Sequence, residues 1–151
     1  MPRMATFLIR PYWPYALVVG ILVWTASSAA GELHVTVGGV RNDAGNVRVA
    51  LYQTPEQFAT KAGRFLEVVI PASTGTIEGA FAEVPPGTYG LAAFHDENDN
   101  VTFDENFLGI PQEGFGFGND APVFLGPPDF AEASVSVEDG SKSVNLTLQY
   151  W

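Results

Sequence analysis

The sequence predicts an all-β fold, a seven-stranded Greek-key sandwich of immunoglobulin-like size with one long ordered loop and one short helix. Three observations lead to this prediction. Seven short segments alternate apolar and polar residues or are apolar throughout, as strands do. Clusters of Gly, Pro, Asn and Asp separate these segments. No internal repeat or linker divides the chain of 151 residues, so we expect a single domain.

The first two strands are expected at residues 33–37 and 47–51. In both segments large apolar residues recur at every second position, which is the period of a half-buried strand. His34 falls on the polar face of the first strand and should point to solvent. Glycines and an Asn-Asp-Ala-Gly turn at 42–45 separate the two segments, which predicts a hairpin or near-hairpin.

The short helix should begin at Thr54, which can cap it, with Pro55 in the first helical position. We expect only one or two helical turns, with Phe58 facing inward. Two further strands are expected at residues 65–70 and 76–81, and a proline ends the first of them.

A central strand is expected at residues 88–95, because apolar residues occupy both of its faces. A Val-Pro-Pro-Gly corner at 84–87 precedes it, since Pro fixes φ and Gly accepts a positive φ. The last two strands, at residues 133–137 and 144–150, alternate again. The Asp-Gly pair at 139–140 between them is a hairpin signal.

Residues 1–30 have the pattern of a secretory signal peptide. Arg3 and Arg10 precede an apolar run at 16–24, and small residues follow it. The apolar run of about ten residues is shorter than the roughly 20 that a spanning helix needs. We therefore expect cleavage, export to the periplasm or the medium, no stable membrane insertion afterwards, and a mature single β-sandwich domain over residues 31–151.

The charge of the chain restricts its partners. The formal charge is −10, and loss of the two signal arginines leaves five basic residues against 17 acidic ones, or −12. Such a chain repels nucleic-acid phosphates and anionic lipid head groups and attracts cations. The chain has no cysteine, so a bound metal would be one way to hold a long loop without a disulfide. The remaining partners are unknown, with a small molecule or a glycan as candidates.

A long connection from residue 95 to residue 130 links the fifth and sixth expected strands. A loop of this length without a strand or helix pattern is usually functional or disordered. Disorder is disfavoured here, because the loop holds six phenylalanines and aromatic residues are depleted in disordered chains. The sequence therefore predicts an ordered, oxygen-rich loop held on a β scaffold.

Oxygen-bearing side chains occupy every second position at the start of this loop. They are Asp96, Asn98, Asn100, Thr102 and Asp104. Asp, Asn, Asn and Asp in this spacing match positions 1, 3, 5 and 9 of the EF-hand calcium loop. Since calcium takes six to eight oxygen ligands, these residues predict a calcium site with a mainly structural role.

The loop departs from the EF-hand at two positions. Val101 stands where Gly usually makes the sharp turn, and Phe107 stands where a bidentate Glu is usual. The missing ligands would have to come from Glu105, Glu113, Asp120 or a backbone carbonyl. The alternative is a solvated turn in which Asn and Asp serve only their turn preferences.

A second group of candidates would bind a ligand rather than a metal. In this alternative, a module for a small molecule or glycan uses loop 107–130, with Phe115 and Phe117 as an aromatic platform and His95 and Glu113 beside them. The competing interpretation places both rings in the edge or end of the sandwich, with the flanking glycines allowing sharp turns. It makes His95 a hydrogen-bonded structural residue.

Enzyme chemistry has little support in the sequence. There is no Cys nucleophile and no Gly-x-Ser-x-Gly elbow. No spacing among the acidic residues selects a pair for sugar hydrolysis. A hydrolase would have to use His95 with nearby carboxylates, so we expect a non-enzymatic protein.

Four motifs complete the sequence evidence. They are PPGTY at 85–89, HDEN at 95–98, NFLGIP at 106–111 and EGFGF at 113–117. Together they resemble a family of small secreted bacterial proteins that is known only as a domain of unknown function, in which Gly usually stands in place of Val101. The resemblance spans most of the mature chain and implies export but no activity. The PPGTY corner is also similar to that of transthyretin-like and carboxypeptidase-regulatory-like β-sandwiches, which implies the same kind of fold.

Overall fold

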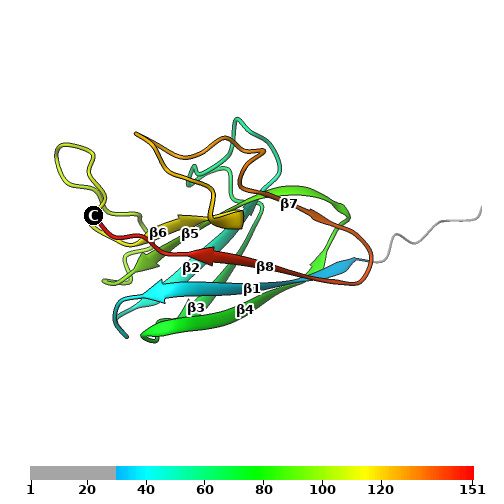
Figure 1. Ribbon diagram of the computed structural model, residues 1–151, viewed down its shortest axis with the longest axis horizontal. Coiled ribbons are helices and arrows are strands. Elements are labelled where there is room, and N and C mark those ends of the chain that lie inside the picture. The colour runs from blue at the N-terminus through cyan, green and yellow to red at the C-terminus, as the bar shows by residue number, and fades with distance from the viewer. Residues whose placement is uncertain (1–29) are drawn as a thin grey trace, which may run out of the picture.

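The computed structural model describes residues 30–151, which form two β-sheets packed against each other (Figure 1). The first sheet has the strand order β4-β1-β8, and the second has the order β3-β2-β5-β6 with β7 also paired to β5. The eight strands are β1 (Gly31–Val40), β2 (Asn46–Tyr52), β3 (Leu66–Pro71), β4 (Gly75–Val84), β5 (Gly87–Asp96), β6 (Phe115–Phe117), β7 (Ser134–Val137) and β8 (Ser141–Thr147). The all-β prediction is confirmed.

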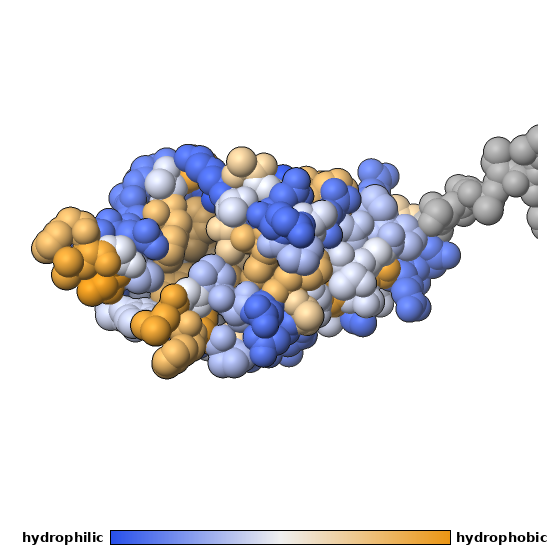
Figure 2. Space-filling model, turned by 90° about the horizontal axis from the view of Figure 1, so that it is seen from above, coloured by the Kyte–Doolittle hydropathy of each residue, from blue (hydrophilic) through white to orange (hydrophobic). Residues whose placement is uncertain are grey.

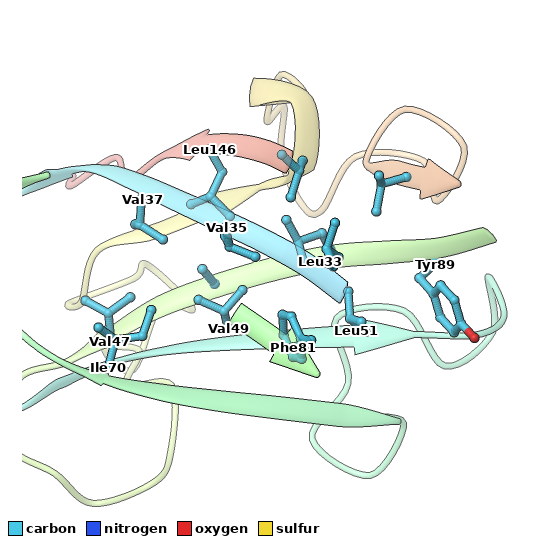
Figure 3. Packing of buried hydrophobic residues seen from close by; sticks show 14 of the residues in the cluster. Leu33, Val35, Val37, Val47, Val49, Leu51, Ile70, Phe81, Tyr89 and Leu146 are labelled. Atoms are coloured by element: carbon cyan, nitrogen blue, oxygen red, sulfur yellow. The ribbon is translucent and has the colours of Figure 1, made fainter. Parts of the chain in front are cut away.

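The core between the two sheets comes from the alternation that the sequence shows in β1 and β2. Because side chains of a strand point to opposite faces in turn, every second residue enters the core. The fully buried side chains that meet there from these two strands are Leu33, Val35, Val37, Val47, Val49 and Leu51 (Figure 3).

Strand β5 is central in the second sheet, as predicted. β2 runs antiparallel along one side of it, with Val49 opposite Ala93. β7 and β6 follow one another along its other side, β7 against residues 87–90 and β6 against residues 92–94. β5 therefore contributes side chains both to the core between the sheets and to the outer face of the second sheet.

The outer face of the second sheet is also covered. Small and aromatic side chains form a second apolar cluster there, beneath the segments that follow β2 and β5. Its buried members are Ala50, Tyr52, Phe58, Phe94, Phe115, Phe117, Ala121 and Ala133. This second layer explains why β5 is apolar on both faces and why Ala50 and Tyr52 of β2 are buried outside the core between the sheets.

The short helix predicted at Thr54 is wrong. Residues 54–60 form successive turns, in which the amide of Phe58 donates to the carbonyl of Pro55 at 3.2 Å. Phe58 is buried as expected, but Ala59 takes a left-handed φ of 56°, which ends any helix there. Within residues 30–151 the helical structure is confined to a 3₁₀ turn, η1 (Gly118–Asp120).

Both predicted hairpins are also wrong. β1 lies in the first sheet and β2 in the second, and β7 and β8 are divided between the sheets in the same way. The turn residues at 42–45 and 139–140 do reverse the chain, but each turn crosses from one sheet to the other. β1 instead pairs in parallel with β8, with Val35 opposite Val144.

The structure adds one strand to the seven expected. β6, residues 115–117, lies inside the stretch that the sequence presents as a loop. The predicted signal segment falls outside the described residues, apart from Ala30. Among residues 30–151, no helix has the length and apolar character needed to cross a membrane.

Candidate functional site

A buried arginine anchors the start of the long loop. Arg48 lies on the outer face of β2, diagonal to Asp96 at the end of β5. The Nε of Arg48 donates to Oδ2 of Asp96 at 2.7 Å, and its Nη2 donates to Oδ1 of Asp99 at 3.2 Å. A third carboxylate, that of Glu67 on β3, lies 3.6 Å from Nη1. One guanidinium therefore serves three acidic groups from three segments.

The charge of Arg48 is secure despite its burial. Burial alone would lower the pKa of Arg48, but the hydrogen bond and the negative charge of Asp96 raise it above the ordinary value, aided by Glu67 and Asp99. Arg48 is a permanent cation at any physiological pH. Asp96 is fully buried, and Arg48 is the positive partner of its carboxylate there.

Asp96 also shapes the turn that follows it. Its Oδ1 accepts the amide of Asn100 at 2.9 Å, and its Oδ2 accepts the amide of Val101 at 2.9 Å. Asp99 and Val101 both adopt left-handed backbone conformations, with φ of 55° and 63°. The sharp turn that Gly usually makes in such loops is therefore present here with valine in its place.

Replacing Val101 with glycine should stabilise the protein. A β-branched residue in the left-handed region destabilises the folded state by about 1–2 kcal/mol, and glycine removes this strain. Part of the gain is lost because glycine makes the unfolded chain more flexible and so raises the entropic cost of folding. We expect the free energy of unfolding in urea to rise by about 1 kcal/mol. Val101→Gly should contrast with Val69→Gly, an exposed strand position without a positive φ, where the same change should destabilise. An unchanged or lower stability of Val101→Gly would contradict this account.

Three of the five predicted metal residues meet. The Nδ2 of Asn98 donates to Oδ2 of Asp104 at 2.7 Å, and the Nδ2 of Asn100 donates to both carboxylate oxygens at 3.1 and 2.9 Å. Asp96 faces Arg48 instead. The Thr102 hydroxyl lies 3.2 Å from the Lys61 ammonium, outside this group.

Side-chain oxygens that would bind calcium already accept hydrogen bonds within the loop. The side-chain carbonyls of Asn98 and Asn100 accept the backbone amides of Asn100 and Thr102, at 3.1 and 2.7 Å. Across residues 30–151, no group of three or more His, Cys, Asp or Glu residues is arranged to hold a metal ion. Calcium binding at this loop stays a prediction.

His95 and Glu113 are buried and hold the ends of the loop. His95 lies 2.7 Å through Nε2 from the carbonyl of Ala44 and 2.8 Å through Nδ1 from the hydroxyl of Tyr150. It is fully enclosed, so a hydrolase mechanism that needs His95 to reach a substrate has no access route to it. A hydrogen-bonded structural histidine is one of the two interpretations that the sequence allows for His95.

Glu113 ties two parts of the loop together. Its Oε1 accepts the amide of Glu97 and its Oε2 accepts the amide of Asp104, both at 3.1 Å. Burial raises the pKa of Glu113, and the nearby charges of Asp104 and Asp96 raise it further, while the two amides lower it in part. Its carboxylate is committed to the backbone and lies out of reach of a ligand.

Phe115 and Phe117 lie in the second apolar cluster and form part of the floor of a cavity. The cavity has a volume of about 550 Å³ and lies over the outer face of β2, β5 and β6. Small side chains, including Ala50 and Ala92, leave this space open, and Phe103 and Ile110 form part of its wall. Figure 2 shows a hollow with apolar surface inside it on this face.

The polar groups of the cavity are few. Arg48, Arg64 and Glu105 contribute charged side chains to its lining. The Nη1 of Arg64 is 2.7 Å from Oε1 of Glu67, and its guanidinium lies 5.4 Å from the centre of the Phe94 ring. Sequence reasoning missed the cavity and both arginines. The feature of the sequence that could have indicated the cavity is the pair of small residues, Ala50 and Ala92, on two expected strands.

Comparison with known proteins is consistent with a bacterial origin and is silent on activity. Residues 35–145 match a family described as "Uncharacterized protein conserved in bacteria (DUF2141)". No curated protein and no solved structure matches the chain. The chemistry of the site therefore has to be argued from its own residues.

Proposed function

The chain belongs to the DUF2141 family of uncharacterised bacterial proteins, and from this premise we propose that it is an exported, non-enzymatic binding module for a small apolar ligand. The observation that carries the proposal is the cavity over the second sheet. Its volume of about 550 Å³ falls within the roughly 300–1,000 Å³ that is usual for small-ligand sites. The leader at residues 1–30 and the single domain of immunoglobulin-like or transthyretin-like type belong to the same proposal.

The lining of the cavity supports an apolar ligand. Phe94, Phe103, Phe115 and Phe117 contribute aromatic surface to it. A ligand that replaces water on this surface gains about 25 cal/mol for each Å² of apolar area removed from water. The rings of Phe94, Phe115 and Phe117 are already buried in their cluster, so this part of the lining needs no ordering when a ligand binds.

The charges around the cavity favour a neutral ligand. Arg48 and Arg64 are the positive groups in its lining, and they already pair with the carboxylates of Glu67, Asp96 and Asp99. With Glu105, which also lines the cavity, these carboxylates already outnumber the two positive groups, and an anionic ligand would add to that excess. Since the whole chain carries a formal charge of −10, long-range electrostatics also disfavours an anion.

Binding of a neutral fluorescent probe tests the proposal. N-phenyl-1-naphthylamine is expected to bind with micromolar affinity and to fluoresce more strongly in the apolar cavity. Ala92→Trp, which fills the cavity from its floor, should weaken binding by about tenfold or more. Ala82→Trp is the matched control, because Ala82 is exposed on β4 in the other sheet and this change should leave binding unaltered. Failure of the probe to bind, or equal binding by both variants, would refute the proposal.

The calcium prediction enters the proposal as a structural support for the cavity wall. The side-chain amides of Asn98 and Asn100 converge on Asp104 through their nitrogens. Rotating each amide by half a turn would bring its oxygen to the same place, at the cost of the hydrogen bonds that these oxygens accept from the backbone amides of Asn100 and Thr102. The Asp96 carboxylate already binds the amides of the turn and has lone pairs left. Loop 96–104 contains Phe103 and is followed directly by Glu105, and both residues line the cavity, so a bound cation would stiffen that wall.

A thermal melt tests the calcium site. Extracellular calcium modules bind with dissociation constants near 10⁻⁴–10⁻³ M, so about 10 mM calcium should raise Tm by about 4 °C relative to a chelator. Asp104→Asn should abolish this shift, whereas Asp139→Asn on the exposed β7–β8 turn should retain it. Identical Tm values in calcium and in chelator would remove the site.

A further inference from the structure

Two loop tips carry large apolar side chains out into solvent beside the cavity. The first tip, residues 106–110, exposes Phe107 and Leu108 by 94% and 68%. The second tip, residues 123–127, exposes Phe124 and Leu125 by 86% and 88%. A soluble protein rarely presents such side chains in groups without a use, because each one orders water around it. Figure 2 shows apolar projections on two sides of the hollow.

The first tip is built to project these residues. Asn106 makes four hydrogen bonds across it. Its side-chain Oδ1 accepts the backbone amides of Leu108 and Ile110 at 2.9 and 3.1 Å. Its backbone amide donates to the carbonyl of Ile110, and its backbone carbonyl accepts the amide of Gly109. Gly109 has a φ of 74°, which a tight reversal requires. The exposure of Phe107 therefore results from a hydrogen-bonded turn that holds its backbone in place.

Both tips border the mouth of the cavity. Leu108 of the first tip and Leu125 of the second tip line it, while Phe107 and Phe124 extend beyond it. The apolar surface inside the cavity is thus continuous with the apolar surface of the tips. A ligand leaving the cavity through this mouth would meet whatever the tips contact.

From these observations we propose that the two tips insert into the surface of an uncharged, zwitterionic lipid bilayer, so that the cavity mouth opens toward the lipid. Two separate convex projections would require a partner protein with two matching sockets, whereas an acyl layer accepts them without a preformed shape. This inference rests on the proposed function for its purpose: an apolar ligand could pass between lipid and cavity without crossing water.

The charges around the tips decide which lipid is suitable. Segments 103–113 and 119–129 contain no Lys or Arg, and the acidic residues that they expose at least in part are Asp104, Glu105, Asp120 and Asp129. Peripheral proteins usually use basic residues to approach anionic lipids, and this surface has the opposite sign. Binding should therefore be strongest on phosphatidylcholine and should weaken when anionic lipid is added.

Flotation with vesicles of phosphatidylcholine tests the inference. The wild-type protein should float with the vesicles, and Phe107→Ser/Phe124→Ser should reduce its partition by about tenfold or more. Both rings are almost entirely exposed, so this double variant should melt like the wild type. Val69→Ser, at an exposed apolar position on β3, is the matched control and should float normally. Replacing part of the lipid with phosphatidylglycerol should reduce flotation, and added salt should restore it.

The outcomes separate this inference from the proposed function. Absence of flotation overturns the inference, and so does equal flotation of the double variant and the wild type. A wild-type dimer that the double variant loses, in the absence of any vesicle binding, also overturns it in favour of a second copy of the chain. Vesicle binding that depends on the tips supports the inference even if N-phenyl-1-naphthylamine fails to enter the cavity, a result that would refute the proposed function alone.

Discussion

Replacing Arg48 with methionine is expected to lower the free energy of unfolding by about 3–5 kcal/mol. The change keeps the length and apolar stem of the side chain but leaves the fully buried carboxyl group of Asp96 without its positive partner. Asp99 and Glu67 lose the same partner. Since small domains have total stabilities of about 5–15 kcal/mol, a loss of this size removes a large part of the whole.

Urea unfolding of a small set of variants checks this prediction. Arg41→Met is the matched control, because Arg41 also pairs with a carboxylate, Glu97, at 2.6 Å but is half exposed. An exposed pair of this kind contributes about 0–1 kcal/mol. Combining Arg48→Met with Asp96→Asn should cost much less than the sum of the two single changes, since the double variant leaves no fully buried carboxylate without a partner. Equal and small effects of Arg48→Met and Arg41→Met would show that Arg48 does not anchor the loop.

Replacing Gly45 with alanine is expected to destabilise the protein by about 3 kcal/mol or more. Gly45 lies in the turn that crosses from β1 to β2 and has a φ of 62°. A Cβ atom built there would lie 2.0 Å from the carbonyl oxygen of Asp96 and 2.9 Å from the backbone of Glu97. The backbone at the end of β5 cannot move aside without disturbing the Arg48–Asp96 contact.

Gly109→Ala is the control that separates the clash from the backbone conformation. Gly109 has a similar φ of 74°, but a Cβ added there meets nothing within 4 Å. Its replacement should cost only the left-handed strain, about 1–2 kcal/mol. Both variants can be compared by urea unfolding at one temperature. Equal losses for Gly45→Ala and Gly109→Ala would mean that the contact with Asp96 has no energetic weight.

Strand positions were predictable because they depend on local periodicity. Alternation at period two located β1, β2, β7 and β8, and apolar character on both faces identified β5 as central. Strand β6 escaped prediction because three residues, Phe-Gly-Phe, are too short to show a period. The helix at Thr54 was wrongly predicted because a cap and a proline specify where a helix can begin and carry no information on whether it continues.

Strand pairing was not predictable in the same way. The Asp-Gly pair at 139–140 turns the chain equally well whether the next strand joins the same sheet or the opposite one. The choice depends on which neighbour completes the core, and for β8 that neighbour is β1, more than a hundred residues earlier in the chain. Turn chemistry is local, whereas this choice is made by distant side chains.

The acidic loop shows the same division. Its spacing predicted that oxygen side chains would share a centre, and Asn98, Asn100 and Asp104 do meet. No spacing within the loop could reveal that Asp96 would turn away to Arg48, which lies 48 residues before it.

The sequence by itself determined the all-β class, the central strand and the composition of the acidic loop, because these follow from the period and chemistry of neighbouring residues. Only the tertiary structure decided the sheet partners, the buried Arg48–Asp96 pair and the cavity over Ala50 and Ala92. Each of these depends on which distant segments pack against one another. A carboxylate or an alanine has the same local preferences whether an arginine, a calcium ion or an empty space comes to lie beside it.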